Sequence, residues 1–254
     1  MIRRYPYDLH IHSCLSPCGD DDMTAWNIAG MASLNGLAIA ALTDHNTCRN
    51  CPAFFKACEN YGIVPVAGME LTTAEEIHLV CLFERLEDAM RFDTAVYELI
   101  PPVMNRESVF GAQIILDDDD NEVGRESKLL VNAACISLED AVSLVKSYGG
   151  VCHPAHIDRE ANGIVGVLGV FPDEPEFSAF ELNDPAKLGE YVSMFPKLSS
   201  MRLVVSSDAH DLCSINEPVN FFELPPSDTP EQTRRLLFEY LRGGADERAF
   251  TQHT

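Results

Sequence analysis

Histidines in this chain gather at the ends of short apolar runs, beside acidic residues. The opening motif is Asp8-Leu9-His10-Ile11-His12. In an extended strand its two imidazoles lie on the same face, because side chains alternate. Two adjacent, partly buried imidazoles repel each other when protonated, whereas a divalent metal binds the neutral form of both. The motif therefore favours metal binding, with a pair of structural histidines as the alternative.

Further clusters of the same residue types open or close other apolar runs. These clusters are Asp44-His45, Glu70, His78, His153 with His156, and Asp208-Ala209-His210. Each is weak evidence alone. In α/β proteins, however, strand ends converge on the catalytic face, so the clusters should meet there. The set predicts a centre of several metal ions.

The elements that must position these residues follow an alternating pattern typical of the α/β class. Strands are expected over 7–13, 37–43, 63–67, 77–83, 150–153, 177–182 and 202–206. Capping residues mark helices between them, and the last helix is expected over about 229–242. A β-hairpin is expected as an insertion at about 109–134, with strands over 111–116 and 128–132. The acidic run between those strands does not have the spacing of a calcium-binding hand.

Composition limits the possible partners. The 254 residues suit a single domain over 1–254, and 18 basic against 40 acidic residues give a net charge of -22. Because duplex binding depends on phosphate neutralisation, we expect a small phosphorylated substrate or short nucleotide, and no extended nucleic acid duplex. No apolar run is long enough for a membrane helix and no signal peptide is evident, so no membrane partner is expected. Nine scattered cysteines indicate a reducing cytoplasm. The sequence does not indicate an oligomeric state.

The ordered series of His-x-His, Asp-His, Glu, His, His-Pro and Asp-x-His resembles the PHP domain (polymerase and histidinol phosphatase) family. The series extends from Asp8 to His210. The resemblance implies a distorted seven-stranded (β/α) barrel with two or three divalent metal ions at the strand ends. It also implies hydrolysis of a phosphate ester.

Carried over by motif, the family's ligands fall into three sites that share some residues. The implied ligands are His10, His12, Asp20, His45, Glu70, His78, His153, Asp208 and His210. Glu70 would bridge the first two ions, and the third would take His45, His210 and an acid from the first loop. That loop is longer than the family's Ser-Asp-Gly pattern, so Asp20 competes with Asp21 and Asp22. Nitrogen and oxygen ligands together favour Zn, Mn or Fe(II).

Such a centre suits attack of a metal-activated water on phosphorus. The substrate would be a phosphorylated metabolite, a nucleotide or an oligonucleotide end. Arg159 is the first candidate for a phosphate clamp and Arg49 the second, although either could be a surface side chain. His156 could protonate the leaving group or simply pack in its loop. Asp44 could hold a ligand imidazole in one tautomer, or cap a loop.

Two other functions remain open. A PHP-type domain can be a non-catalytic structural or regulatory module, but here every expected ligand type is present. A metal-dependent hydrolase of a non-phosphate bond commonly has a bridging Lys at a strand end, and no predicted strand ends in Lys.

Cysteines near the first two clusters suggest a further possibility. Cys48-x-x-Cys51, together with Cys14 or Cys18, could form a thiolate metal site or a redox pair, and Cys58 follows in the same stretch. Free thiols are the alternative.

Overall fold

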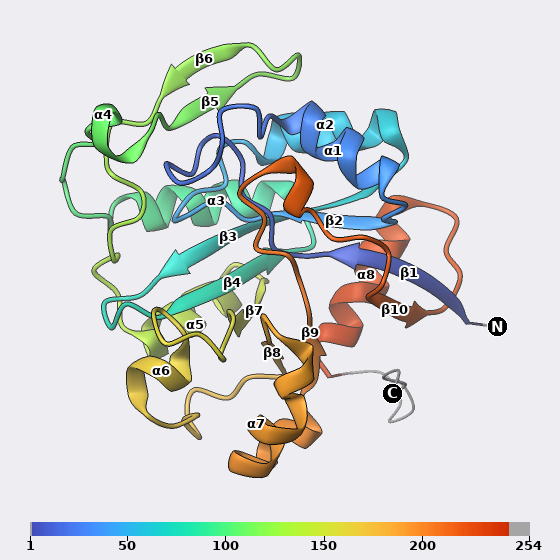
Figure 1. Ribbon diagram of the computed structural model, residues 1–254. Coiled ribbons are helices and arrows are strands. Elements are labelled where there is room, and N and C mark those ends of the chain that lie inside the picture. Colours follow the sequence, from blue (N-terminus) through green and yellow to red (C-terminus); the bar gives the residue numbers. More distant parts are fainter. Residues whose placement is uncertain (1, 244–254) are drawn as a thin grey trace.

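The computed structural model describes residues 2–243 and has a curled, six-stranded sheet at its centre (Figure 1). Its strands, in spatial order, are β10 (Phe221–Leu224), β1 (Arg3–Asp8), β2 (Ile39–Leu42), β3 (Val64–Thr72), β4 (His78–Phe83) and β7 (Val151–Pro154). The strands β1, β2 and β3 are parallel, whereas β4 runs antiparallel to both β3 and β7. The carboxyl ends of the three parallel strands therefore meet at one edge.

Two further strands lie between β7 and β1. They are β8 (Ala179–Glu181) and β9 (Arg202–Val204), which pair in parallel. Their connections to the main sheet are isolated: Ile157 N donates to Glu181 O at 2.9 Å, and Val205 N donates to the Tyr7 hydroxyl at 3.2 Å. The expected seven-stranded barrel is not confirmed, because the described chain forms a six-stranded half-barrel with separate two-stranded sheets.

The insertion also differs from its prediction. Strand β5 (Ile114–Leu116) pairs with β6 (Glu122–Arg125), which lies inside the acidic run, so the strand predicted over 128–132 is wrong. The side chain of Gln113 supplies the reason. Its amide donates to the Glu126 and Lys128 carbonyls and accepts from Leu130 N, and these bonds replace a ladder at that position.

Helices cover both faces of the sheet. On one face lie α1 (Ala25–Leu34), α2 (Cys51–Tyr61), α3 (Leu86–Tyr97) and α5 (Leu138–Ser147), whereas α8 (Pro230–Leu241) packs on the other (Figure 1). The chain also contains α4 (Glu107–Phe110), α6 (Ile164–Leu168), α7 (Leu188–Met194) and the short helices η1 (Pro185–Lys187), η2 (Pro196–Ser200) and η3 (Leu212–Ser214). None of the helices within 2–243 has the length and apolar character needed to cross a membrane.

Capping and burial explain why these helices form and dock. The hydroxyls of Thr24, Ser137 and Thr229 accept backbone N–H bonds at the starts of α1, α5 and α8. The α8 side chains Leu237 and Phe238 are fully buried. Burial of each contributes about 1.5–3 kcal/mol, which holds the helix against the sheet.

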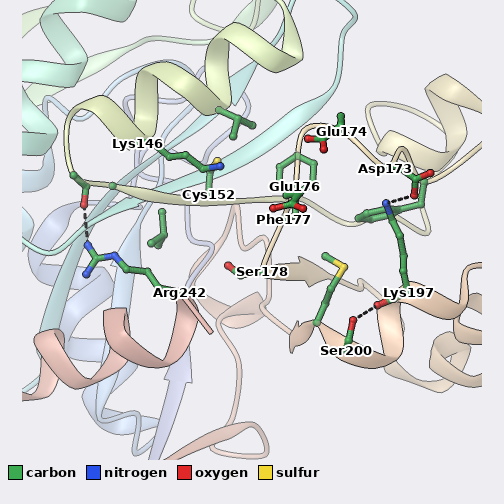
Figure 2. Close-up of a pocket in the computed structure, with 16 residues that line it drawn as sticks. Lys146, Cys152, Asp173, Glu174, Glu176, Phe177, Ser178, Lys197, Ser200 and Arg242 are labelled. Carbon is green, nitrogen blue, oxygen red and sulfur yellow. Dashed lines mark hydrogen bonds and ion pairs between the residues drawn. The ribbon is translucent and has the colours of Figure 1, made fainter. Parts of the chain in front are cut away.

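A cavity of about 790 Å³ opens at the start of β7 (Figure 2). Charged side chains of both signs line it, among them Lys146, Lys197, Arg242 and Glu176. None of the predicted site residues lines it. The predicted site residues lie toward the opposite end of β7.

Candidate metal centre

The two ends of the described chain meet at the carboxyl edge of the sheet. The ladder of β1 stops at Asp8, and the chain beyond it pairs with the C-terminal motif through a parallel bridge between Ile11 and Ala209. His12 N donates to Ala209 O at 2.9 Å. This pairing brings His10 and His12, both fully buried, against Asp208.

Four ligand atoms form a compact group, the central group, made of His10, His12, Glu70 and Asp208. The Nε2 atoms of the two histidines are 3.2 Å apart. Each lies 3.1–3.3 Å from Asp208 Oδ1 and 3.3–3.4 Å from a Glu70 oxygen. Ligands at about 2.0–2.1 Å from one tetrahedral zinc ion are about 3.3 Å apart. The spacing of the central group fits a bound divalent ion.

Glu70 extends this arrangement to a second group, the outer group, made of His45, Glu70 and His78. Glu70 Oε2 lies 3.0 Å from His45 Nδ1, and Oε1 lies 2.7 Å from His78 Nδ1. Neither nitrogen has a hydrogen-bond partner, although both are buried. Buried, unpaired donor atoms that converge on a carboxylate are better explained by a shared ion than by hydrogen bonding.

A third group, the histidine triad, consists of His12, His45 and His210. Its members contribute no carboxylate. The ring centroids of His12 and His210 lie 4.2 Å apart, and those of His12 and His45 lie 4.5 Å apart. Seven of the nine predicted ligands therefore lie in the three groups, and their roles as ligands stay predictions.

The charges in this pocket suit a bound cation. Burial raises the pKa of Glu70, but the imidazoles of His78, His10 and His45 hold it well below the usual range. Burial likewise raises the pKa of Asp208, and His10 and His12 outweigh that effect, so the net shift is downward. Burial lowers the pKa of His10, while Glu181, Asp208 and Glu70 raise it well above its usual value. A divalent ion supplies the same positive charge and leaves the imidazoles neutral.

Hydrogen bonds set the ligand tautomers. The Glu181 carboxylate accepts from His10 Nδ1 at 3.0 Å, which leaves Nε2 with a lone pair. The Ser16 hydroxyl donates to Asp44 Oδ1 at 2.7 Å, so it accepts from His12 Nδ1 at 3.0 Å. Asp44 thus acts on an imidazole through Ser16 rather than directly.

Sequence reasoning missed Glu181. This residue ends β8, where it is buried among apolar residues and also accepts from His156 N at 3.1 Å. A single acid inside an otherwise apolar predicted strand was the available signal, because an unpaired buried carboxylate is costly. Asp8, also buried, accepts from backbone N–H groups of His10, Ser207 and Asn216, so it holds loops rather than an imidazole.

The structure places His156, not His153, beside the outer group. His153 pairs directly with Val80, which itself pairs with Glu70, so the three side chains share one face of the sheet. His153 Nε2 is buried without a hydrogen-bond partner, but it belongs to none of the three groups. His156 Nε2 lies 3.2 Å from Glu70 Oε1, and its Nδ1 is buried without a partner. A positive φ of 25° at His156 turns the chain after β7, and sequence patterns do not show such a turn.

The first-loop acids do not join any group. Asp20, Asp21 and Asp22 are all exposed, and none belongs to the three sets of ligand atoms. Asp20 does lie beside the centre through its backbone, because its N–H donates to His210 O at 2.9 Å.

The two candidate arginines differ in position. Arg159 Nη1 donates to Asp208 Oδ2 at 2.6 Å, and its side chain is 41% exposed at the rim of the centre. Arg49 instead binds Glu126 and stacks on Tyr97, with 4.5 Å between its Cζ and the ring centroid. Arg49 therefore contacts the predicted insertion, whereas Arg159 faces the candidate site.

The cysteine motif does not form a metal group in the described chain. The thiols of Cys48 and Cys51 both contact the Gly68 carbonyl, at 3.1 and 3.6 Å. Burial raises the pKa of Cys48 well above its usual value, so it is a protonated core residue. Cys58 is likewise a buried free thiol, whereas Cys18 is exposed.

A comparison of sequences finds one family. Residues 8–126, a little under half of the chain, match the PHP domain. The match covers five of the seven grouped ligands and ends well before Asp208 and His210. No protein of curated function matches the chain by sequence.

Solved structures with a similar fold include two of endonuclease Q. The enzyme from Pyrococcus furiosus superposes with a TM-score of 0.63 at 17% identity, over 96% of this chain and 57% of its own. A complex of endonuclease Q with a 27-mer duplex gives a TM-score of 0.65 at 17% identity, with the same coverage. This chain therefore spans little more than half the length of endonuclease Q.

A protein from Bifidobacterium adolescentis, described as a metal-dependent phosphoesterase on provisional grounds, gives a TM-score of 0.58 at 16% identity. The superposition covers 97% of this chain and 99% of that one. At these identities the likeness shows a common fold.

One sequence expectation about partners is wrong. The exclusion of an extended nucleic acid duplex rested on a net charge of -22. Endonuclease Q shares the fold and binds a 27-mer duplex with an abasic lesion at its active site. Net charge summed over a chain does not describe the field at a site where metal ions are the largest local charges.

Proposed function

We propose that this chain is a metal-dependent phosphoesterase that hydrolyses a phosphate ester of a nucleotide, a phosphorylated metabolite or a nucleic acid strand. The observation that carries the proposal is the position of Glu70, whose two oxygens lie 2.7–3.4 Å from four histidine nitrogens of the central and outer groups. A carboxylate shared in this way suits two closely spaced divalent ions. Such ions, when bound, activate water and stabilise the phosphoryl oxygens of an in-line displacement.

The chain's own residues orient these ligands. Glu181 and Ser16, which Asp44 holds in turn, bind Nδ1 of His10 and His12, so Nε2 is the nitrogen of each ring that faces the ion. In the outer group we assign His156 as a ligand in place of His153, because its Nε2 faces Glu70 and its ring centroid lies 5.3 Å from that of His78.

Arg159 is the proposed phosphate clamp. Asn183 Oδ1 accepts from its Nη2 at 2.9 Å, which orients the guanidinium plane at the rim. Turning one N–H edge from Asp208 to a phosphate oxygen needs only side-chain rotation, because the group is partly exposed. A guanidinium can bind two phosphate oxygens at once, which fixes orientation.

Two alternative functions make different predictions. A structural module would show no metal-dependent turnover. The described site nevertheless retains histidine, aspartate and glutamate, which are all the ligand types expected of an active centre. A hydrolase of a non-phosphate bond commonly uses a bridging Lys, whereas Glu70 occupies the shared position here.

The test combines metal analysis with a substrate screen. The purified chain, supplied with Mn²⁺ or Zn²⁺, should hydrolyse at least one member of a panel of phosphomonoesters, phosphodiesters, mononucleotides, single strands and duplexes with an abasic site. Asp208→Ala should lose turnover and bound metal, whereas the exposed Glu176→Ala should lose neither. Full activity in Asp208→Ala, or absence of bound metal in the unmodified chain, would overturn the proposal.

A further inference from the structure

The cavity at the start of β7 lies apart from the metal centre (Figure 2). Its volume of about 790 Å³ falls within the range of about 300–1,000 Å³ that is usual for small-molecule sites. Four segments line it: 142–152 of α5 and β7, 171–178 before β8, 197–201 around η2, and Arg242 after α8. None of the grouped ligands belongs to these segments, so a molecule bound here would not contact the three metal groups.

The middle of the cavity wall is apolar and aromatic. Phe171 and Met201 are buried, whereas Phe177 is partly exposed. The rings of Phe171 and Phe177 meet edge to face, with their centroids 6.2 Å apart and their planes at 77°. Figure 2 shows Phe177 between the two ends of the cavity. A flat ring can stack on such a wall, and aromatic side chains commonly bind nucleobases in this way.

Two basic side chains stand at one end of the cavity, beside the turn between α5 and β7. Arg242 Nη2 donates to Gly149 O at 2.9 Å, and the pair of Arg242 with Glu84 is loose, at 3.9 Å. The Lys146 ammonium is turned toward Cys152 on β7 (Figure 2), and it makes no hydrogen bond or ion pair within residues 2–243. Gly149 leaves room between them, because a Cβ there would meet no atom within 4 Å. Both basic residues therefore keep N–H donors for an anion.

The acidic side chains that line the cavity come from one loop, 173–176. Asp173 and Glu174 are exposed, and Figure 2 shows them at the opposite end from the two basic residues. Lys197 is held at this acidic end, because its Nζ lies 3.2 Å from Asp173 Oδ1. Carboxylates accept hydrogen bonds, so this end suits N–H and O–H donors of a ligand.

We propose that this cavity binds a nucleoside monophosphate. The phosphate binds Lys146 and Arg242, the base stacks on Phe177, and amino or hydroxyl donors face the acidic end. A guanidinium and an ammonium together suit a phosphate, because the first binds two oxygens and the second adds a point charge. A fatty acid lacks both the ring and the donors, and a sugar phosphate lacks the ring. The inference does not depend on the proposed function, since the metal centre lies elsewhere.

Calorimetry of the full chain in excess chelator tests this site, because a metal centre without ions cannot hydrolyse the probe. Adenosine monophosphate is the probe, and adenosine and inorganic phosphate supply its two parts separately. Lys146→Ala and Arg242→Ala each remove one phosphate contact, and both residues are exposed, so the variants should fold. Circular dichroism checks this. Lys56→Ala is the matched control, because Lys56 is also an exposed helical lysine but lies on α2.

One molecule of adenosine monophosphate should bind per chain, and adenosine and inorganic phosphate should each bind at least about tenfold more weakly. Lys146→Ala and Arg242→Ala should each weaken binding about tenfold or more, the size expected for loss of one hydrogen bond to a charged group. Lys56→Ala should leave the affinity unchanged. Absence of binding, equal affinity for either separate part, or unchanged affinity in a folded cavity variant would refute the site. Each of these outcomes leaves metal-dependent turnover to be judged by the substrate screen.

Discussion

Removal of the Glu181 carboxylate should weaken metal binding without direct loss of a ligand. The side chains of Glu181 and His10 are 2% and 0% exposed, so water cannot replace their hydrogen bond. Loss of such an outer partner reduces metal affinity by about 10–100-fold, and complete burial puts Glu181→Ala at the upper end of that range. This corresponds to about 2.7 kcal/mol.

Glu181→Gln separates charge from hydrogen bonding. Oε1 accepts from both His10 Nδ1 and His156 N, at 3.0 and 3.1 Å, so a glutamine oxygen at that place can keep both bonds. The negative charge and the weaker contact of Oε2 with His10 Nδ1, at 3.3 Å, are lost, and the expected decrease in affinity is about tenfold.

Affinity would be measured by competition with a chromophoric chelator, with circular dichroism as a check on folding. Glu176→Ala is the control, because Glu176 is exposed and lines the cavity at the start of β7. If folded Glu181→Ala bound metal as tightly as the unmodified chain, the assignment of His10 as a ligand oriented by Glu181 would be wrong.

Three further predictions concern the rim, the core and the strand that carries the shared carboxylate. Arg159→Ala should reduce kcat/KM by about a hundredfold, and Arg159→Lys should restore only part of that activity, because an ammonium cannot bind two phosphate oxygens in the way a guanidinium does. The measurement is steady-state kinetics on the substrate found in the screen. Equal kcat/KM values for the unmodified chain and both variants would exclude a phosphate clamp. Burial lowers the pKa of His153 to about 4. In the unfolded chain His153 binds a proton below about pH 6.5, whereas in the folded chain it stays neutral until about pH 4. The folded state is therefore fully stable above about pH 6.5 and loses stability as the pH falls from about 6.5 toward 4. In urea denaturation with excess chelator, the unmodified chain should lose about 2 kcal/mol more than His153→Leu between pH 8 and pH 5, and identical losses would contradict this. Gly68→Ala places a Cβ 2.8 Å from both Cys81 O and Thr43 Cγ2, so it should lower stability by about 1–3 kcal/mol, and an unchanged melting temperature would refute this crowding.

Strand-end patterns were sufficient to predict which ligand types converge. His45 follows β2 and Glu70 lies near the end of β3. The direction of these parallel strands brings the two residues together, as their parallel bridge shows. The α/β class follows from the same alternation of elements. The closure of the barrel did not follow, because β8 and β9 connect to the main sheet through single hydrogen bonds rather than ladders.

The remaining features depend on backbone turns that periodicity does not encode. Asp208 has a positive φ of 52° and His156 one of 25°, and both turn side chains into the pocket where strand alternation would not place them. Each conformation costs about 1–3 kcal/mol, so only the folded surroundings select it. Glu181 was missed for a related reason: its partner His10 is 171 residues away, and no local pattern joins them.

The bridge between Ile11 and Ala209 has a consequence for synthesis in the cell. The central group draws ligands from both termini of the described region, His10 and His12 from one and Asp208 from the other. During translation, therefore, a nascent chain cannot assemble this group until residue 208 has left the ribosome, even if its N-terminal half collapses earlier. The central group would then form only after residue 208 has been synthesised, and products terminated before that residue would lack it.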